Sequence, residues 1–272
     1  MLPNAAEWDK FYAALKGRTG LDLHLYKPGQ MQRRIISMCE SKSCKNLEDF
    51  WKVISTEKDG INWFLDKMAI NVSELFRNPE KWVELEQKIL PELLSKAPRL
   101  KIWSAGCSIG AEAHSVATIL ADKFPGSHTI VGTDIDQAAL AQARSGVYSE
   151  METKCVPAPY KAKYYDRDGT NFVAKPELKK YLNFKTGNLL EDNFDSGFDL
   201  IICRNVVIYF TDEAKDALYR RFFNSLKPGG ILFVGSTERI FNYRDMGYEA
   251  PITFFYQKPV NGETQRIWRS AS

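Results

Sequence analysis

The stretch that decides the fold is KIWSAGCSIGAEAHS, residues 101–115. An apolar, strand-like run leads into a turn of small residues, and a stretch of helical character follows. Glycines at such a turn let the chain reverse sharply and let a ligand approach the backbone. The stretch predicts a strand, a turn and a helix of an open α/β sheet with a ligand at the turn. A tight turn without a ligand would show the same glycines.

Beyond this stretch, strand-like runs alternate with helical segments. The runs are KIWSA, HTIVGTD, YLNFKTGN, FDLIICRN, GGILFVGS and TFFYQKP. Such alternation predicts parallel β-α units in one open sheet. A helix is expected over 211–226, with Thr211 as its N-cap. The stretch 151–180 has no clear period and is predicted to loop over the sheet.

The first 75 residues show a helical pattern instead. Apolar residues recur at intervals of three and four, which predicts helices that each bury one face. These residues are Trp8, Phe11, Tyr12, Leu15, Met31, Ile35, Met38, Cys39, Leu47, Phe50, Trp51, Ile54, Phe64, Leu65 and Met68. The periodicity breaks over 70–82. We expect a helical domain over 1–75, a linker helix over 76–95, an α/β domain over 96–260 and a tail over 261–272.

Bulk composition narrows the classes of function. A formal net charge of +3 over 272 residues is too small to indicate nucleic-acid binding. No apolar run reaches the roughly 20 residues of a membrane-spanning helix, and charged residues stand where a signal peptide would be apolar. The five cysteines form no CxxC pair, so we expect neither disulfides nor a metal site. We expect a soluble, cytoplasmic protein.

An acidic residue stands where a nucleotide cofactor needs one. Asp134 ends the run HTIVGTD, and an acid at this place accepts hydrogen bonds from two ribose hydroxyls. The preceding turn, residues 105–110, is not G-x-G-x-x-G and lacks the lysine of a P-loop. Together the turn and the acid predict an adenosine-containing cofactor, either a dinucleotide or S-adenosylmethionine.

Polar residues also follow the third and fourth predicted strands. In open α/β sheets, ligands bind beyond the carboxyl ends of the strands. Asn188 follows the third strand, where it would either meet the adenine edge, with Leu189 as a wall, or cap a helix. Arg204, Asn205 and Tyr209 follow the fourth strand, and an arginine there is either a functional charge or half of a structural ion pair.

Six motifs in order resemble the CheR family of chemotaxis receptor methyltransferases, which use S-adenosylmethionine (SAM). They are INVSELFRNPEKW, KIWSAGCSIGAEAHS, GTDIDQAALAQARSGVY, NLLEDNF, FDLIICRNVVIYF and LKPGGILFVGSTE. The resemblance covers about residues 8–258. It implies a class I SAM-dependent methyltransferase domain with a Rossmann-like, mostly parallel sheet, an N-terminal all-α domain and a small β-subdomain near 160–183.

The resemblance also implies an activity. Family members transfer the methyl group of SAM to glutamate carboxylates on the cytoplasmic helices of chemotaxis receptors. The products are glutamate methyl esters and S-adenosylhomocysteine, and the reaction serves sensory adaptation. A catalytically weak adaptor that binds SAM or S-adenosylhomocysteine on the same fold is the alternative.

Site residues follow from the resemblance position by position. Asn71, Ser73 and Arg77 match the family's N-x-[ST]-x-F-[FY]-R segment, which lines the cofactor pocket. The further cofactor-binding positions it implies are Ala105, Gly106, Glu112, Asp134, Ile135, Asn188, Leu189, Arg204 and Asn205. Arg77 and Tyr209 are expected to shape the methyl-transfer site.

The chain departs from the family pattern in the turn after the first strand. Where G-E-E-P-Y is usual, the sequence reads Gly110-Ala111-Glu112-Ala113-His114, so one acid and one aromatic residue are replaced. We expect Glu112 to carry the cofactor contact. We expect His114 to be a packed residue rather than a base.

The predicted second helix and the residues after it carry a basic face. Its members are Arg33, Arg34, Lys42 and Lys45. Charge runs are usually solvated surface, but a basic face also suits an acidic helical bundle, and family members use this helix to recognise the receptor. We therefore expect the four residues to contact the receptor. Because the segment 160–183 is short, we do not expect it to dock a receptor C-terminal pentapeptide. We expect a monomer.

Overall fold

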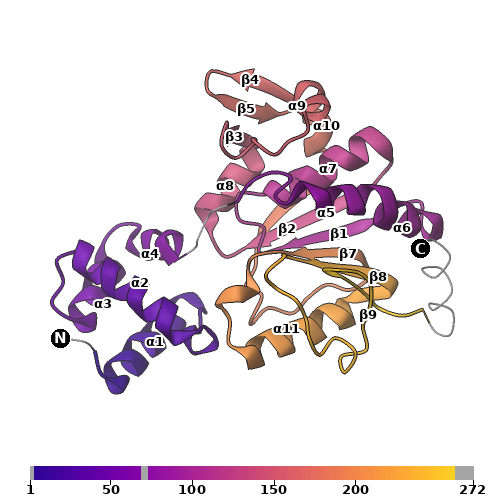
Figure 1. The fold of residues 1–272 in the computed structure, drawn as a ribbon. Helices are drawn as coiled ribbons and strands as arrows, with labels where there is room; N and C mark the ends of the chain where they lie inside the picture. The colour runs from indigo at the N-terminus through magenta and orange to yellow at the C-terminus, as the bar shows by residue number, and fades with distance from the viewer. Residues whose placement is uncertain (1–2, 69–72, 261–272) are drawn as a thin grey trace.

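The computed structural model describes residues 3–68 and 73–260. Figure 1 shows a group of helices at the N-terminal end beside a larger part built on a twisted sheet. No helix within the described ranges combines the length and the apolar character needed to cross a bilayer.

The N-terminal part is a helical bundle. Its elements are α1 (Ala5–Thr19), η1 (Leu23–Leu25), α2 (Pro28–Ser41), α3 (Leu47–Thr56) and α4 (Gly60–Met68). The predicted apolar faces meet in its core, where Leu15, Ile35, Phe50 and Phe64 are fully buried. The bundle therefore owes its stability to the periodic pattern seen in the sequence.

One continuous helical stretch connects the bundle to the sheet. It consists of α5 (Pro79–Glu84), a π-helical turn (Leu85–Ile89) and α6 (Leu90–Lys96). Trp82, Leu85 and Ile89 are buried in the same hydrophobic cluster as the central strands. The linker helix expected over 76–95 is observed as this stretch, which begins at Pro79 and ends at Lys96.

The sheet has seven strands in the order β6-β2-β1-β7-β8-β10-β9. Their bounds are β1 (Lys101–Ala105), β2 (Thr129–Asp134), β6 (Leu182–Thr186), β7 (Phe198–Cys203), β8 (Leu226–Val234), β9 (Glu249–Ile252) and β10 (Phe255–Gln257). Strands β6, β2, β1, β7 and β8 are parallel, and β10 runs antiparallel to both β8 and β9. The mostly parallel α/β sheet is therefore confirmed.

Helices cover both faces of the sheet (Figure 1). α7 (Ala111–Lys123) and α8 (Gln137–Ser145) pack on the face that also carries α5 and α6, and α11 (Asp212–Ser225) packs on the other. β7 serves both cores, because Leu200 and Ile202 belong to one hydrophobic cluster while Ile201 and Cys203 belong to the other. Thr211 caps α11 as predicted, since its Oγ1 accepts the Ala214 N–H at 3.3 Å.

A small antiparallel sheet stands on the α7–α8 side of the molecule. It consists of β3 (Val147–Ser149), β4 (Tyr165–Asp168) and β5 (Asn171–Ala174) in the order β3-β5-β4, accompanied by α9 (Ala158–Tyr164) and α10 (Pro176–Lys179). The small β-subdomain is thus confirmed, although its first strand precedes the expected range 160–183. The prediction that 151–180 is irregular was wrong. Most of β4 is exposed and charged, which hides the strand pattern in the sequence.

The bundle and the sheet are joined by a two-residue main-chain bridge. Tyr26 pairs antiparallel with Phe210. The Lys27 N–H donates to the Tyr209 carbonyl, and the Thr211 N–H donates to the Leu25 carbonyl, both at 2.9 Å. Because α2 and α11 begin directly after this bridge, their N-termini are fixed beside each other.

Candidate active site

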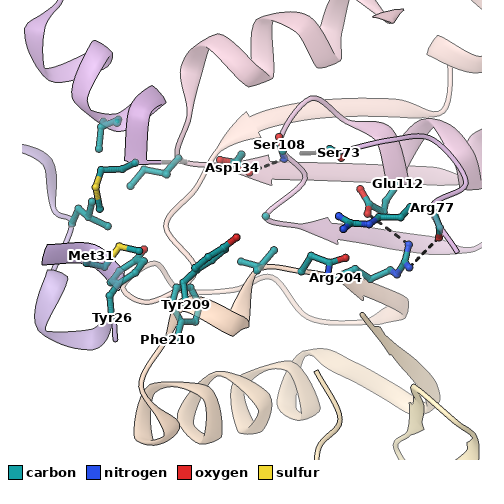
Figure 2. A pocket seen from close by; sticks show the side chains of 17 residues that line it. Tyr26, Met31, Ser73, Arg77, Ser108, Glu112, Asp134, Arg204, Tyr209 and Phe210 are labelled. Atoms are coloured by element: carbon teal, nitrogen blue, oxygen red, sulfur yellow. Dashed lines mark hydrogen bonds and ion pairs between the residues drawn. The ribbon is translucent and has the colours of Figure 1, made fainter. Parts of the chain in front are cut away.

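A cavity of about 160 Å³ lies at the carboxyl ends of β1, β2 and β7, between the sheet and the helical bundle (Figure 2). Its walls come from both parts of the chain. The lining residues are Leu21, Tyr26, Met31, Leu65, Met68, Ser73, Arg77, Gly106, Ser108, Glu112, Asp134, Ile135, Arg204, Asn205, Val206, Tyr209 and Phe210. The structure thus brings together most of the residues that the sequence proposed.

The turn after β1 forms one side of the cavity. Three of its residues have left-handed backbone conformations, Gly106 with φ 68°, Ser108 with φ 47° and Gly110 with φ 78°. Gly106 also lies so close to the next turn that a Cβ atom would come within 2.6 Å of Val206 Cγ2. Glycine is therefore required at 106 for both conformation and space. Ala105, which was proposed as a cofactor contact, is buried at the end of β1 and does not line the cavity.

Asp134 stands at the end of β2 and faces the same turn. Its Oδ2 accepts the Ser108 N–H at 2.7 Å, and its Oδ1 accepts the Asp136 N–H at 3.0 Å. Burial raises the pKa of Asp134, and these N–H groups act in the opposite direction. Ile135 follows it on the cavity wall. The carboxylate is therefore both a brace for the turn and a hydrogen-bond acceptor at the cavity surface.

Glu112 and Arg204 form a buried ion pair beside the turn. Arg204 Nη1 lies 3.7 Å from Glu112 Oε1. Its Nη2 donates to the Arg77 carbonyl at 3.1 Å and to Asn78 Oδ1 at 2.9 Å, which ties β7 to the segment before α5 (Figure 2). Burial raises the pKa of Glu112, whereas the Arg204 and Arg77 charges and a Ser73 hydrogen bond lower it. The pair fixes opposite charges at one end of the cavity.

Three polar atoms at this end have no hydrogen-bond partner among the described residues. They are Arg204 Nε, Arg204 Nη1 and Asn205 Oδ1, and all three are buried. Buried polar atoms normally have partners. Two donors and one acceptor beside the cavity suit a ligand that carries both a carboxylate and an ammonium group. The residues present therefore fit the amino-acid end of SAM.

Two of the proposed cofactor residues lie elsewhere. Asn188 and Leu189 line a neighbouring cavity of about 90 Å³ under the loop after β6. The Asn188 amide is engaged at both ends, since Nδ2 donates to the Gly20 carbonyl at 3.2 Å and Oδ1 accepts the Leu190 N–H at 3.0 Å. Their contact with adenine stays a prediction. Asn71 lies outside the described residues.

The sequence did not indicate the apolar wall that the helical bundle contributes. Leu21, Tyr26, Met31, Leu65 and Met68 all reach the cavity. Their spacing marked Met31, Leu65 and Met68 as core positions of helices, and this signal does not distinguish a core from a cavity wall. This wall gives the cavity a mostly apolar lining on the side opposite the ion pair.

Two of the departures from the family turn, Ala111 and His114, have separate structural explanations. Ala111 is fully buried in the core and is not among the residues that line the cavity, so this position offers no polar group there. His114 is also fully buried. Its Nδ1 lies 3.0 Å from the Gly110 carbonyl and 2.7 Å from the Tyr148 hydroxyl. His114 is a packed residue that braces the end of the turn.

The four basic residues proposed for receptor contact differ in exposure. Arg33 and Lys45 are exposed, whereas Arg34 and Lys42 are half-buried. Arg34 donates through Nε to the Lys67 carbonyl. Lys42 pairs with Glu57 and lies 4.7 Å from the centre of the Trp63 ring. Arg33 and Lys45 are therefore the more accessible members of this face.

Two family descriptions match nearly the whole chain. "CheR methyltransferase, SAM binding domain" matches residues 71–255, and "CheR methyltransferase, all-alpha domain" matches residues 6–69. The chain belongs to the CheR methyltransferase family. It is therefore a SAM-dependent methyltransferase of chemotaxis, and the charged end of the cavity is consistent with that cofactor.

The chain is similar in sequence to individual chemotaxis protein methyltransferases over most of their length. The chemotaxis protein methyltransferase of Listeria innocua is 37% identical over 250 residues, which cover 91% of this chain and 95% of the relative. Chemotaxis protein methyltransferase 1 of Pseudomonas aeruginosa is 31% identical over 254 residues, with coverage of 88% and 92%. The chemotaxis protein methyltransferase of Salmonella typhimurium is 30% identical over 241 residues, with coverage of 83% and 81%.

Proposed function

We propose that this CheR methyltransferase acts in the cytoplasm as a monomer and methylates glutamate side chains on the helical cytoplasmic region of a chemotaxis receptor. The observation that carries the proposal is the division of the cavity. One end is built from buried charges that fit the amino-acid part of SAM, and the other is apolar and formed by the bundle that includes α2. A glutamate side chain, with an apolar stem and a charged end, suits the space between them.

The chemistry requires little from acid–base groups. A glutamate with a pKa of about 4.3 is already ionised at neutral pH and is itself the nucleophile. When bound, SAM supplies an electrophilic methyl group on a sulfonium. The protein has to align the carboxylate oxygen with that methyl group and exclude water. This explains why a base is not needed at the site.

We assign the alignment to Arg77 and Tyr209, which both line the cavity. The Arg77 guanidinium would hold the carboxylate of the substrate. Burial raises the pKa of Tyr209, so its hydroxyl keeps its proton at neutral pH and can donate to the same carboxylate. Ser73, Gly106, Glu112, Asp134, Ile135, Arg204 and Asn205 would hold SAM, together with Asn71, Asn188 and Leu189 by family likeness.

The direct test is methylation of receptor cytoplasmic fragments with methyl-labelled SAM. We expect label that alkali releases as methanol, because a glutamate methyl ester hydrolyses whereas an N-methyl group does not. Arg77→Ala should lower turnover strongly. Alkali-stable label, or no label on any receptor fragment, would reject glutamate as the substrate.

The docking face is tested by the double variant Arg33→Ala/Lys45→Ala. Removal of two exposed charges should raise the KM for receptor roughly fivefold at low salt, with kcat unchanged, since exposed ion pairs each contribute up to about 1 kcal/mol. High salt should reduce the difference. Lys123→Ala, at the far end of α7, is the matched control. A KM that neither the double variant nor salt alters would place the receptor elsewhere.

A further inference from the structure

Glu238 is a buried carboxylate for which the reaction has no direct use. It lies in the loop after β8, is 4% exposed and does not line the cavity. Its Oε2 accepts the Asn205 N–H at 2.5 Å and the Gly235 N–H at 2.9 Å, and its Oε1 accepts the Val207 N–H at 2.9 Å. All these partners are backbone groups.

Two of the three donors belong to the turn after β7. Asn205 in this turn has φ 61°, a left-handed conformation that disfavours a residue with a side chain. The N–H groups of residues 205 and 207 both point to one side of this turn, as backbone N–H groups do in a concave anion site. Here the Glu238 carboxylate fills that site. The strain at Asn205 is therefore offset by charge-assisted hydrogen bonds.

The space for this carboxylate depends on a glycine. A Cβ atom at Gly235 would lie 2.5 Å from Glu238 Oε2 and 3.0 Å from the Asn205 nitrogen. Gly235 and Glu238 thus form one unit with the turn. Burial raises the pKa of Glu238, and its backbone donors act to keep it ionised.

We propose that Glu238 is a positioning residue for methyl transfer. By accepting the N–H groups of residues 205 and 207, it holds the turn that places Arg204, Asn205 and Tyr209 on the wall of the cavity. Glu238 itself touches neither cofactor nor substrate. The inference rests on the proposed roles of Arg204, Asn205 and Tyr209 in the site.

The test compares Glu238→Gln with Tyr248→Phe. Glutamine places an NH₂ group against a backbone donor, so we expect the turn to shift. Calorimetry well below the unfolding temperature should show SAM binding at least tenfold weaker, and kcat should fall as well. Tyr248→Phe removes a buried hydrogen bond that the Tyr248 hydroxyl donates to the Tyr219 carbonyl. Both tyrosines belong to the hydrophobic cluster that includes α11 and β8. It should lower the melting temperature but leave SAM affinity and kcat unchanged.

Glu238→Asp keeps the charge and should restore part of the SAM affinity, and it serves if the glutamine variant does not fold. Wild-type SAM affinity and kcat in either folded Glu238 variant, whatever its melting temperature, would overturn the proposal. The SAM measurement needs no receptor. A wild-type protein that binds SAM but does not methylate receptor would therefore refute the proposed substrate without deciding the role of Glu238.

Discussion

Two turns at neighbouring strand ends border the cavity, and each is braced by a carboxylate from farther along the chain, Asp134 at the end of β2 and Glu238 in the loop after β8. After β1, Asp134 accepts the N–H of Ser108. After β7, Glu238 accepts the N–H groups of Asn205 and Val207. Asp134 lines the cavity, whereas Glu238 is 4% exposed and does not line it. The same kind of brace is therefore part of the cavity wall in one turn and lies outside that wall in the other.

The turns also differ in how they reach left-handed backbone. The first turn has glycine at two of its three such positions, Gly106 and Gly110, whereas the second has Asn205. Glycine adopts this conformation without a steric penalty. In each turn the left-handed residue with a side chain, Ser108 in the first and Asn205 in the second, donates its N–H to the bracing carboxylate, so both turns place a carboxylate where the conformation carries a steric cost.

The largest effect is expected where the two turns touch. Gly106→Ala would impose a side chain at φ 68° and bring Cβ within 2.6 Å of Val206 Cγ2. The left-handed conformation and the overlap together should cost about 3 kcal/mol of unfolding free energy. Chemical denaturation measures this, and calorimetry should show SAM binding lost or strongly weakened.

A second substitution separates the two causes. Val206→Ala removes the methyl groups that a Cβ at 106 would meet, so Gly106→Ala/Val206→Ala should recover about half of the lost stability. If the double variant is no more stable than Gly106→Ala, the turns are not coupled through this contact.

Asp134→Ala should mainly affect the cofactor. If Asp134 accepts hydrogen bonds from the ribose as the sequence predicts, loss of the carboxylate should lower SAM affinity roughly a hundredfold, or about 2.7 kcal/mol. The Ser108 N–H would also lose its acceptor. Asp168→Ala, in the exposed strand β4, provides the control. Unchanged calorimetric affinity would mean that Asp134 only braces the turn, which would make the two carboxylates equivalent.

His114 should give the first turn a smaller, pH-dependent effect. Burial lowers the pKa of His114 to about 4, below the value of about 6.5 in an unfolded chain. Between these values the unfolded state binds a proton that the native state does not. The free energy of unfolding should therefore decrease as the pH is lowered, by about 2 kcal/mol between pH 6.5 and pH 5.

His114→Phe should remove this slope from denaturation curves measured across that range. His24 provides the contrast, because it is exposed and a hydrogen bond to Asp22 raises its pKa. Its contribution is lost only as pH rises above about 6.5, so His24→Asn should keep the acid-side slope. An unchanged slope in His114→Phe would assign the acid sensitivity to other groups.

The sequence predicted the structure correctly where residue type and position along a strand determine the local conformation. The glycines at 106 and 110 and the acid at 134 predicted a turn with a ligand. In the structure, Gly106 and Asp134 line the same cavity. The run FDLIICRN predicted a strand of the parallel sheet, and all six residues of β7 are buried. In these elements, local pattern and tertiary environment agree.

The remaining features depend on contacts that no local pattern records. Glu238 meets only backbone groups, which are the same whatever the sequence of the opposing loop. Met31 and Met68 fit a helix core equally well whether they face a helix or a cavity. Strand β4 is mostly polar and exposed, so it lacks the alternation of apolar residues by which a strand is recognised in a sequence. Only the packing of distant segments decides these cases.

The bridge between Tyr26 and Phe210 has a mechanical consequence. The Lys27 N–H donates to the carbonyl of Tyr209, so the first residue before α2 is linked directly to a residue at the mouth of the cavity. α2 carries Arg33, on the face proposed for docking. A partner that displaced α2 would therefore act on Tyr209 through the two main-chain hydrogen bonds of this bridge.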